Sequence, residues 1–296
     1  MTVPLRSFLF IPGDSEKKIA RIDSTAADAF ILDLEDSVAP ARKEAAREMV
    51  PAFIAGRPIG QRRAQYWVRV NPLDSDAALA DLSAVVAAHP DGIMLPKVDG
   101  PDDVARAGHY LDAFEAAAGL TPGSIRILPV ATETPAAPFT LGMYAKARLP
   151  RLYGLTWGAE DLSAAMGASG NTDASGRWTN TYRMVRSLCL LGAHAAGVEA
   201  VDTLHVDFRD TDGLRRSCEA ARGEGFSGRI AIHPAQVDII NAAFVPTEAE
   251  IEFARRVVSA FDAEPDAGTL SIDGKMLDIP HLKQARRTIA LYEARC

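Results

Sequence analysis

Cysteine is scarce in this chain of 296 residues. The three cysteines, Cys189, Cys218 and Cys296, are odd in number and far apart, so they match neither a zinc-binding spacing nor a disulfide framework. They are typical of reduced thiols in a cytosolic enzyme. The sequence therefore gives no sign of a secreted fold held together by disulfides.

Long hydrophobic runs are also missing. No stretch of the sequence approaches the roughly 20 apolar residues that a membrane span needs. Pro12 and Gly13 end the short apolar run near the N-terminus before it reaches the length of a signal-peptide core. We therefore expect a cytoplasmic protein that has no membrane partner.

Positive charge is in deficit, because 32 Lys and Arg residues face 39 Asp and Glu residues and give a net charge of −7. This balance argues against nucleic acid or an acidic membrane surface as the main partner. It leaves room for an anionic small molecule, which needs only a local basic pocket. The hydrophobic share of 48% and the charged share of 24% are ordinary for a globular protein.

A glycine-rich phosphate loop is absent after the first apolar run, where "IPGDSEKK" has one glycine and the dinucleotide fingerprint needs three. Short apolar runs instead alternate with longer amphipathic ones along the chain. Eight runs are predicted as strands: 6–11, 29–35, 65–70, 92–98, 125–131, 152–158, 197–204 and 228–234. The segment 101–118 has the apolar period of a helix. Repeated strand and helix units predict a (β/α)₈ barrel over residues 1–245, and a doubly wound open sheet is the alternative.

The segment 246–296 follows the eighth unit and is not needed to close a barrel. Thr247 and Glu250 form a capping-box pattern at the start of a predicted helix. "AEPDAG" ends that helix, "TLSIDGKMLDIP" is predicted to be an irregular arm, and "HLKQARRTIALYEARC" is predicted to be a last helix.

Charged and polar residues recur where the predicted strands end. Since the carboxyl ends of barrel strands meet at one rim, these side chains should lie close together. They are Glu35, Asp36, Arg69, Asn71, Lys97, Glu133, Glu160, Asp161 and His233. Each one alone could be a solvated loop charge. Several carboxylates at one rim would repel each other, and a divalent cation such as Mg²⁺ would relieve that repulsion.

Eight motifs in the same order resemble the citrate lyase β-subunit-like family of the HpcH/HpaI aldolase superfamily, which includes malyl-CoA lyase. The motifs are "LFIPGD", "AFILDLEDSVAPARKEAAR", "VRVNP", "LPKV", "ETP", "WGAEDLSAAMG", "IHPAQV" and "DGKMLDIPHLKQA". The resemblance implies a Mg²⁺-dependent carbon–carbon lyase that cleaves or forms a small 3-hydroxyacyl-CoA thioester, such as malyl-CoA or citramalyl-CoA. An aldolase for a free hydroxy-keto acid is one alternative. A citrate lyase-type subunit active only within a carrier-protein complex is another.

The resemblance also implies roles for individual residues. Glu133 and Asp161 look like direct Mg²⁺ ligands, and Glu133 would also contact the substrate. Glu35 and Asp36 match an acidic pair that holds metal-bound water, whereas Asp33 is expected to face the barrel interior. Arg69 matches the arginine that grips an α-keto acid, a task that suits its guanidinium fork.

The C-terminal segment would act in a neighbouring subunit. Asp278 matches a catalytic aspartate that is delivered over the barrel mouth of a neighbour, which implies a homotrimer or hexamer. A turn aspartate before Pro280 is the alternative. Lys17, Lys18 and Arg21 are candidates for binding the phosphates of coenzyme A, against the alternative of a solvated helix face. His233 is either catalytic or a structural histidine at a strand end.

Two segments depart from the family pattern. "VATETPAAPFTLG" is richer in proline than the usual helix after the metal-binding glutamate. "SGNTDASGRWTNT", residues 169–181, is a polar loop that could reshape the pocket. Both leave the predicted metal site intact and leave the acyl group open.

Overall fold

The computed structural model describes residues 3–295. Its main sheet has eight parallel strands in the order β5-β4-β3-β2-β1-β8-β7-β6. Their bounds are β1 Ser7–Pro12, β2 Ala29–Asp33, β3 Gln65–Arg69, β4 Gly92–Leu95, β5 Arg126–Pro129, β6 Gly154–Thr156, β7 Glu199–Asp202 and β8 Gly228–Ala231. The ends of all eight strands lie within three residues of the ends of the predicted runs.

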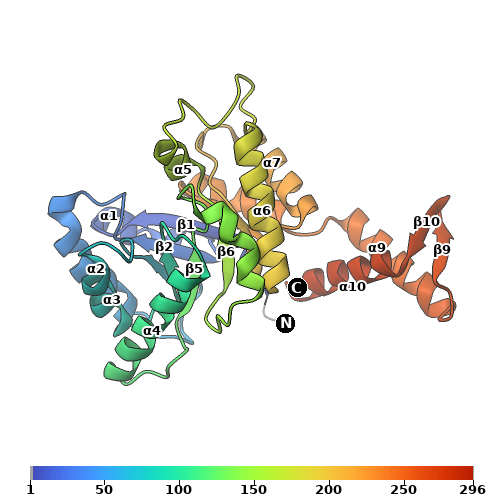
Figure 1. The fold of residues 1–296 in the computed structure, drawn as a ribbon. Helices are drawn as coiled ribbons and strands as arrows, with labels where there is room; N and C mark the ends of the chain where they lie inside the picture. The colour runs from blue at the N-terminus through green and yellow to red at the C-terminus, as the bar shows by residue number, and fades with distance from the viewer. Residues whose placement is uncertain (1–2, 296) are drawn as a thin grey trace.

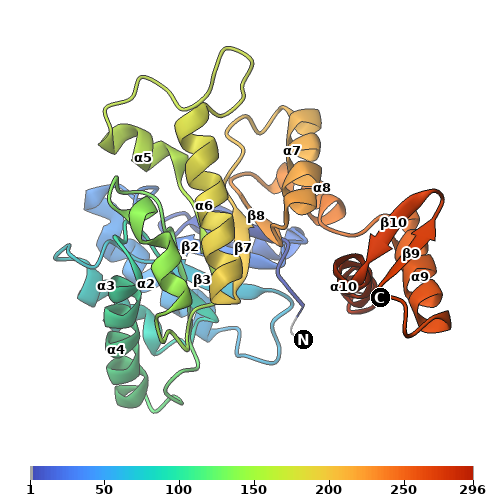
Figure 2. The ribbon, with the colours of Figure 1, turned by 45° about the vertical axis from the view of Figure 1, so that its right-hand side comes forward.

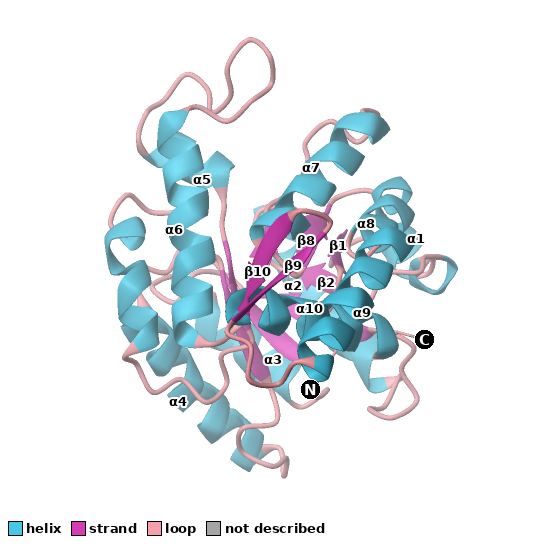
Figure 3. Ribbon diagram, turned by 90° about the vertical axis from the view of Figure 1, so that its right-hand side faces the viewer, coloured by secondary structure: helices cyan, strands magenta, loops and turns pink. Residues whose placement is uncertain are grey.

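Hydrogen bonds between β5 and β6 join the two ends of this sheet. The Ile127 amide donates to the carbonyl of Arg151 (2.8 Å), and the Ala131 amide donates to that of Thr156 (2.8 Å). The strands therefore form a nearly closed barrel, and helices surround them (Figure 3). The predicted (β/α)₈ barrel is confirmed, and the open doubly wound sheet is wrong.

Both faces of the strands are buried, which explains their nearly continuous apolar sequences. In β2, Phe30 and Leu32 belong to the core between the strands and the helices, while Ala29 and Ile31 belong to the smaller core inside the barrel. Alternate residues of one strand thus fill two separate cores.

Helices connect the strands around the barrel (Figures 1 and 2). The α-helices are α1 Glu16–Ile19, α2 Lys43–Ala55, α3 Ala78–Val86, α4 Pro101–Ala117, α5 Ala159–Ala165, α6 Asn180–Ala196, α7 Thr211–Glu224 and α8 Val237–Ala243. Short 3₁₀ helices are η1 Ile22–Ser24, η2 Pro40–Arg42, η3 Ala137–Ala145 and η4 Pro234–Gln236. The proline-rich segment after β5 forms η3, with Pro138 in its first turn. No helix of the described residues is both long and apolar enough to cross a membrane.

A C-terminal arm follows the barrel, and the predicted boundary at residue 245 falls between α8 and α9. The arm consists of α9 Glu248–Ala263, β9 Thr269–Ile272, β10 Lys275–Asp278 and α10 Ile279–Glu293. The expected irregular segment is instead an antiparallel hairpin. Asp273 and Gly274 both have positive φ, 51° and 74°, as a two-residue type I′ turn requires. The Asp-Gly pair was a signal for this hairpin that the sequence analysis missed.

The arm packs around a small core of its own and projects away from the barrel (Figures 1 and 2). Near its C-terminus, Arg295 donates to the Pro4 carbonyl (2.6 Å), just before β1. Helix α1, at the carboxyl end of β1, lies on the opposite side of the molecule from the arm (Figure 1). The arm therefore extends from the amino ends of the strands, away from the rim formed by their carboxyl ends.

Candidate active site

Arg69, the last residue of β3, is held by Asp33, the last residue of β2. Its Nε and Nη2 atoms each donate to an Asp33 oxygen at 2.7 Å. Asp33 is fully buried, as expected, and also accepts from the amides of Glu35 (2.9 Å) and Ser37 (3.0 Å). Burial opposes the charge on Asp33, but the hydrogen bonds and charge of Arg69 outweigh it and hold the Asp33 pKa below its ordinary value.

This pairing occupies one edge of the Arg69 guanidinium. The Nη1 atom points elsewhere and lies 3.0 Å from Oε2 of Glu35. The ring of Phe10 supports the guanidinium carbon at 4.6 Å. Since Asp33 holds Nε and Nη2, Arg69 presents Nη1 to the rim in a fixed orientation.

Lys97, two residues after β4, contacts all four acidic residues that the sequence analysis placed at the metal. Its ammonium lies 2.5 Å from Glu35 Oε1, 3.0 Å from Asp36 Oδ2 and 3.4 Å from Asp161 Oδ1. Its backbone amide donates to Glu133 Oε2 at 2.7 Å. Burial opposes the charge on Lys97, yet Glu35 and Asp36 raise its pKa above the ordinary value. The sequence analysis noted Lys97 at a strand end and gave it no role.

Glu133 is the most strongly perturbed carboxyl group of the rim. It is 5% exposed, and burial, followed by the charge of Asp161, raises its pKa to about 8. Gly158, at the end of β6, leaves room for it, because a Cβ there would lie 2.8 Å from Glu133 Cγ. The Gly158 amide is fixed by Thr132 Oγ1 at 3.0 Å. Thr132 and Gly158 thus position Glu133, a role that was not predicted.

The rim has more carboxylates than cations, and this donor set fits a divalent metal ion. Burial raises the pKa of Glu35 above its ordinary value, and its buried Oε2 accepts no hydrogen bond, although Arg69 Nη1 lies 3.0 Å away in an ion pair. Within residues 3–295, no three His, Cys, Asp or Glu side chains stand in position to hold a metal together. Mg²⁺ does not need such a group of protein ligands, because this ion usually keeps several waters or substrate oxygens.

A cavity of about 710 Å³ lies beside Arg69. Lys18 and Arg21 line it with Arg69 and Asp33, whereas Lys17 does not. His233 also lines the cavity, caps η4 by accepting from the Ala235 amide (3.2 Å), and stacks on Phe208. The cavity thus combines a basic wall with the Arg69 end of the rim.

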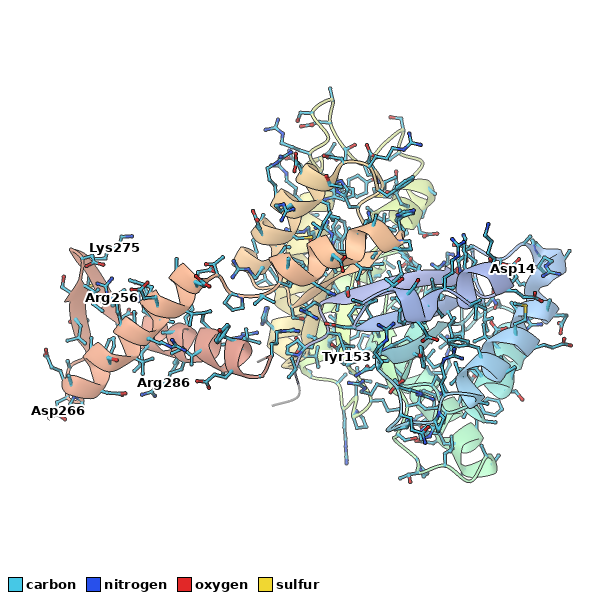
Figure 4. All side chains as sticks on the ribbon, turned by 180° about the vertical axis from the view of Figure 1, so that it is seen from behind. Asp14, Tyr153, Arg256, Asp266, Lys275 and Arg286 are labelled. Atoms are coloured by element: carbon cyan, nitrogen blue, oxygen red, sulfur yellow. The ribbon has the colours of Figure 1, made fainter. Side chains whose placement is uncertain are left out.

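Asp278 lies away from all of these residues. It ends β10 on the arm, is partly exposed, and pairs with Nδ1 of His281 at 2.5 Å. Figure 4 places Lys275, on the same hairpin, and Asp14, just after β1, at opposite sides of the molecule. Asp278 therefore has no place in the active site of its own chain.

Residues 6–234 match the family model described as HpcH/HpaI aldolase/citrate lyase. The chain belongs to the HpcH/HpaI aldolase/citrate lyase family. Seven of the eight motifs that predicted this family lie in the barrel and the eighth lies on the arm, and the predicted family is confirmed. The rim just described is thus the candidate active site of this HpcH/HpaI family member.

Relatives resemble nearly the whole chain. A protein named (3S)-malyl-CoA thioesterase, from Cereibacter sphaeroides, is 38% identical over 98% of this chain and 95% of its own length. Mitochondrial citramalyl-CoA lyase of Rattus norvegicus is 32% identical over 98% of this chain and 86% of its own. The crystal structure of CitE from Mycobacterium tuberculosis, in complex with magnesium, acetoacetate and coenzyme A, covers 98% of both chains with a TM-score of 0.79 and 30% identity.

Proposed function

We propose that this HpcH/HpaI family member is a Mg²⁺-dependent carbon–carbon lyase that cleaves, or forms, a small 3-hydroxyacyl-CoA thioester such as malyl-CoA or citramalyl-CoA. The observation that carries the proposal is the rim itself, where a fixed arginine faces an excess of buried carboxylates beside a basic cavity. The magnesium, acetoacetate and coenzyme A of the similar CitE structure support it.

Glu133 and Asp161 would hold the metal ion directly, and Glu35 and Asp36 would hold its water ligands. Glu133 fits because a nearby cation would offset the burial that raises its pKa. Oε2 of Glu35, which is ion-paired with Arg69 but accepts no hydrogen bond, fits because bound water would donate to it. When bound, the metal would supply a Lewis acid that stabilises negative charge on the carbonyl-derived oxygen of the keto acid.

Arg69 would orient the keto-acid part of the substrate. Its Nη1 is free of the Asp33 pairing and would donate to the substrate carboxylate. Asp33 keeps the guanidinium from rotating, which lowers the entropic cost of binding. Lys18 and Arg21 would meet the phosphates of coenzyme A from the cavity wall, and Lys17 would contribute only long-range charge.

Asp278 of a neighbouring copy would be the general acid–base group. In the cleavage direction its carboxylate would accept the proton of the substrate hydroxyl as the carbon–carbon bond breaks, and the thioester enolate would leave. The position of the arm hairpin, on the opposite side of the molecule from Asp14, supports delivery from another copy (Figure 4). We therefore propose that segment 246–296 completes the active site of a neighbour.

A homotrimer or hexamer would satisfy this requirement. The arm keeps Met276 and Ile279 exposed on either side of Asp278, so apolar surface flanks the catalytic group. On the barrel, an exposed apolar stripe runs along α6 and η3, which pack together. Its members are Phe139, Met143, Met184, Leu188 and Leu191.

This stripe is the surface on which we propose that the neighbour's arm docks. Phe139 is 89% exposed and Leu191 is 64% exposed, values that suit an interface better than a free surface. Since η3 begins four residues after Glu133, an arm seated on it lies close to the rim. Apolar contacts of Met276 and Ile279 there would direct Asp278 toward the metal ligands.

The cysteines support a cytoplasmic location. Cys189 and Cys218 are free and buried, and burial raises the pKa of the Cys189 thiol, which makes it unreactive. Cys296 lies outside the described residues.

Thioester hydrolysis is a second candidate function. The relative that is 38% identical is named a thioesterase, whereas the one at 32% is named a lyase. A hydrolase of the same substrate would break the carbon–sulfur bond with water and release free coenzyme A. Cleavage of a free hydroxy-keto acid and activity only within a carrier-protein complex remain further alternatives.

A substrate screen tests the proposal. The purified full-length chain, without partner proteins, is incubated with Mg²⁺ and a panel of 3-hydroxyacyl-CoA thioesters or free hydroxy-keto acids, and keto acids are trapped as hydrazones. Keto acid released from at least one thioester is the expected result. Keto acid from free acids alone would favour the aldolase, and turnover only after a carrier protein is added would favour the complex.

A further inference from the structure

The ammonium of Lys97 pairs with three carboxylates of the rim. Arg69, the other cation of the rim, donates two hydrogen bonds to Asp33 and pairs with Glu35 through Nη1 at 3.0 Å. The ammonium of Lys97 shares Glu35 with Arg69, and it is the cation that pairs with Asp36 and Asp161. One positive charge among three carboxylates holds them together in the absence of any other ion.

The backbone of Lys97 makes a separate contribution. Its φ is +53°, in the left-handed region that residues other than glycine rarely adopt. In this conformation its amide donates to Oε2 of Glu133 at 2.7 Å. The main chain of Lys97 thus positions one predicted metal ligand, and its side chain occupies oxygens of the others.

Those oxygens cannot serve two cations at once. Under the proposed function, water on the metal would donate to Glu35 and Asp36, and Asp161 would bind the metal directly. The Lys97 ammonium now occupies the same atoms, Glu35 Oε1, Asp36 Oδ2 and Asp161 Oδ1. Its side chain is 31% exposed, so it has a path to solvent without any movement of the backbone.

We propose that Lys97 is a resident cation that keeps the carboxylates together before the metal binds and is displaced from them when the metal arrives. The inference rests on the proposed function, because it takes Glu133 and Asp161 as the metal ligands. It assigns Lys97 two opposed effects. Its amide favours metal binding by holding Glu133, and its ammonium weakens metal binding by competing for the same oxygens.

The test is calorimetric titration of the full-length protein with MgCl₂, without substrate. Lys97→Met removes the charge and keeps most of the side-chain length. Lys97→Gly removes the side chain, retains the amide that faces Glu133, and suits the positive φ, so it guards against misfolding of the first variant. Lys146→Met, at the exposed end of η3, is the control for the loss of one surface charge.

Both Lys97 variants should bind Mg²⁺ about tenfold more tightly than the wild type or more, because a unit charge a few ångströms from a divalent ion is removed. The Lys146→Met protein should match the wild type. In EDTA the Lys97→Met protein should melt at a lower temperature than the wild type, and Mg²⁺ should raise its melting temperature by more.

The outcomes separate this inference from the proposed function. If the wild type binds Mg²⁺ and both Lys97 variants bind it equally well or more weakly, the ammonium does not compete and the inference alone is overturned. If neither the wild type nor the variants bind Mg²⁺, the metal assignment is overturned and this inference with it. If only the Lys97 variants bind Mg²⁺, the ammonium of the wild type excludes the metal completely, and the inference is supported.

Discussion

The residues around Glu133 restrict its side chain to a conformation that points to the rim. The Lys97 amide holds Oε2, and Gly158 presents a bare Cα against the side chain. Few other conformations are open to a carboxylate that is 5% exposed. The proposed metal site therefore depends on Gly158 as well as on its acidic residues.

Gly158→Ala tests that dependence. The new Cβ would lie 2.8 Å from Glu133 Cγ and 3.0 Å from its Oε1, so Glu133 has to move. We expect overpacking to cost about 1–3 kcal/mol of unfolding free energy, and Mg²⁺ affinity to fall by at least about tenfold in calorimetry. Gly142→Ala, where a Cβ meets nothing within 4 Å, is the matched control. Unchanged Mg²⁺ affinity in a folded Gly158→Ala protein would show that Glu133 does not need this space.

The sequence predicted residue types at the rim better than it predicted their contacts. Glu35, Arg69 and Glu133 each follow or end a strand, so their place in the sequence was enough to put them at one rim. The Asp33 pairing and the bridging by Lys97 depend on side-chain directions and on a left-handed φ, which no pattern of residue types reveals. Lys97 was visible as a charged residue at a strand end, within the "LPKV" motif, but without a role.

At the scale of elements, the strands were predictable because two buried faces require apolar residues at nearly every position. The segment after β5 was harder, since its prolines convert an expected helix into the 3₁₀ helix η3. The hairpin β9–β10 was missed because each of its strands is only four residues long and mostly exposed, although Leu270 and Ile272 alternate with polar residues in β9. The function proposed for the hairpin follows from its position, because it carries Asp278 at the end of β10.

Mixing two inactive variants tests delivery of Asp278 by another copy. Asp278→Asn leaves the barrel rim intact, and Glu133→Ala leaves the arm intact. After subunit exchange in an equal mixture, about one site in four should combine an intact rim with an intact arm, and activity should return to about that fraction. Each variant alone should keep its oligomer size and lose most activity, as loss of a general acid–base group typically costs ~10²–10⁴-fold.

Subunit exchange has to be verified in the same mixture, with two affinity tags for example. If verified mixed oligomers stay inactive, Asp278 does not complete a neighbour's site. If Asp278→Asn alone keeps full activity, Asp278 is only the residue that caps α10.

The whole molecule has the form of a barrel with an arm that reaches away from it (Figure 2). Such a shape leaves two apolar surfaces without cover in a single chain, the stripe on α6 and η3 and the exposed residues of the arm. Assembly would cover both and would bring Asp278 to a rim. Oligomer size and catalytic activity should therefore change together.

Charge on the stripe should separate the copies. Leu188→Glu with Leu191→Glu places two carboxylates on the exposed face of α6, and we expect light scattering after size exclusion to report monomers with little activity. Leu79→Glu, on α3 at a residue that is 50% exposed, is the control and should leave the oligomer unchanged. An intact oligomer in the double variant would mean that the neighbour docks elsewhere.

The products formed from (3S)-malyl-CoA distinguish a carbon–carbon lyase from a thioesterase. The full-length protein is incubated with (3S)-malyl-CoA and Mg²⁺, and keto acid, acyl-CoA and free thiol are quantified in the same samples. If the protein is a lyase, glyoxylate and acetyl-CoA should appear in equal amounts without free thiol, and EDTA should stop the reaction. Free thiol and malate without glyoxylate would contradict the lyase proposal and would identify a thioesterase.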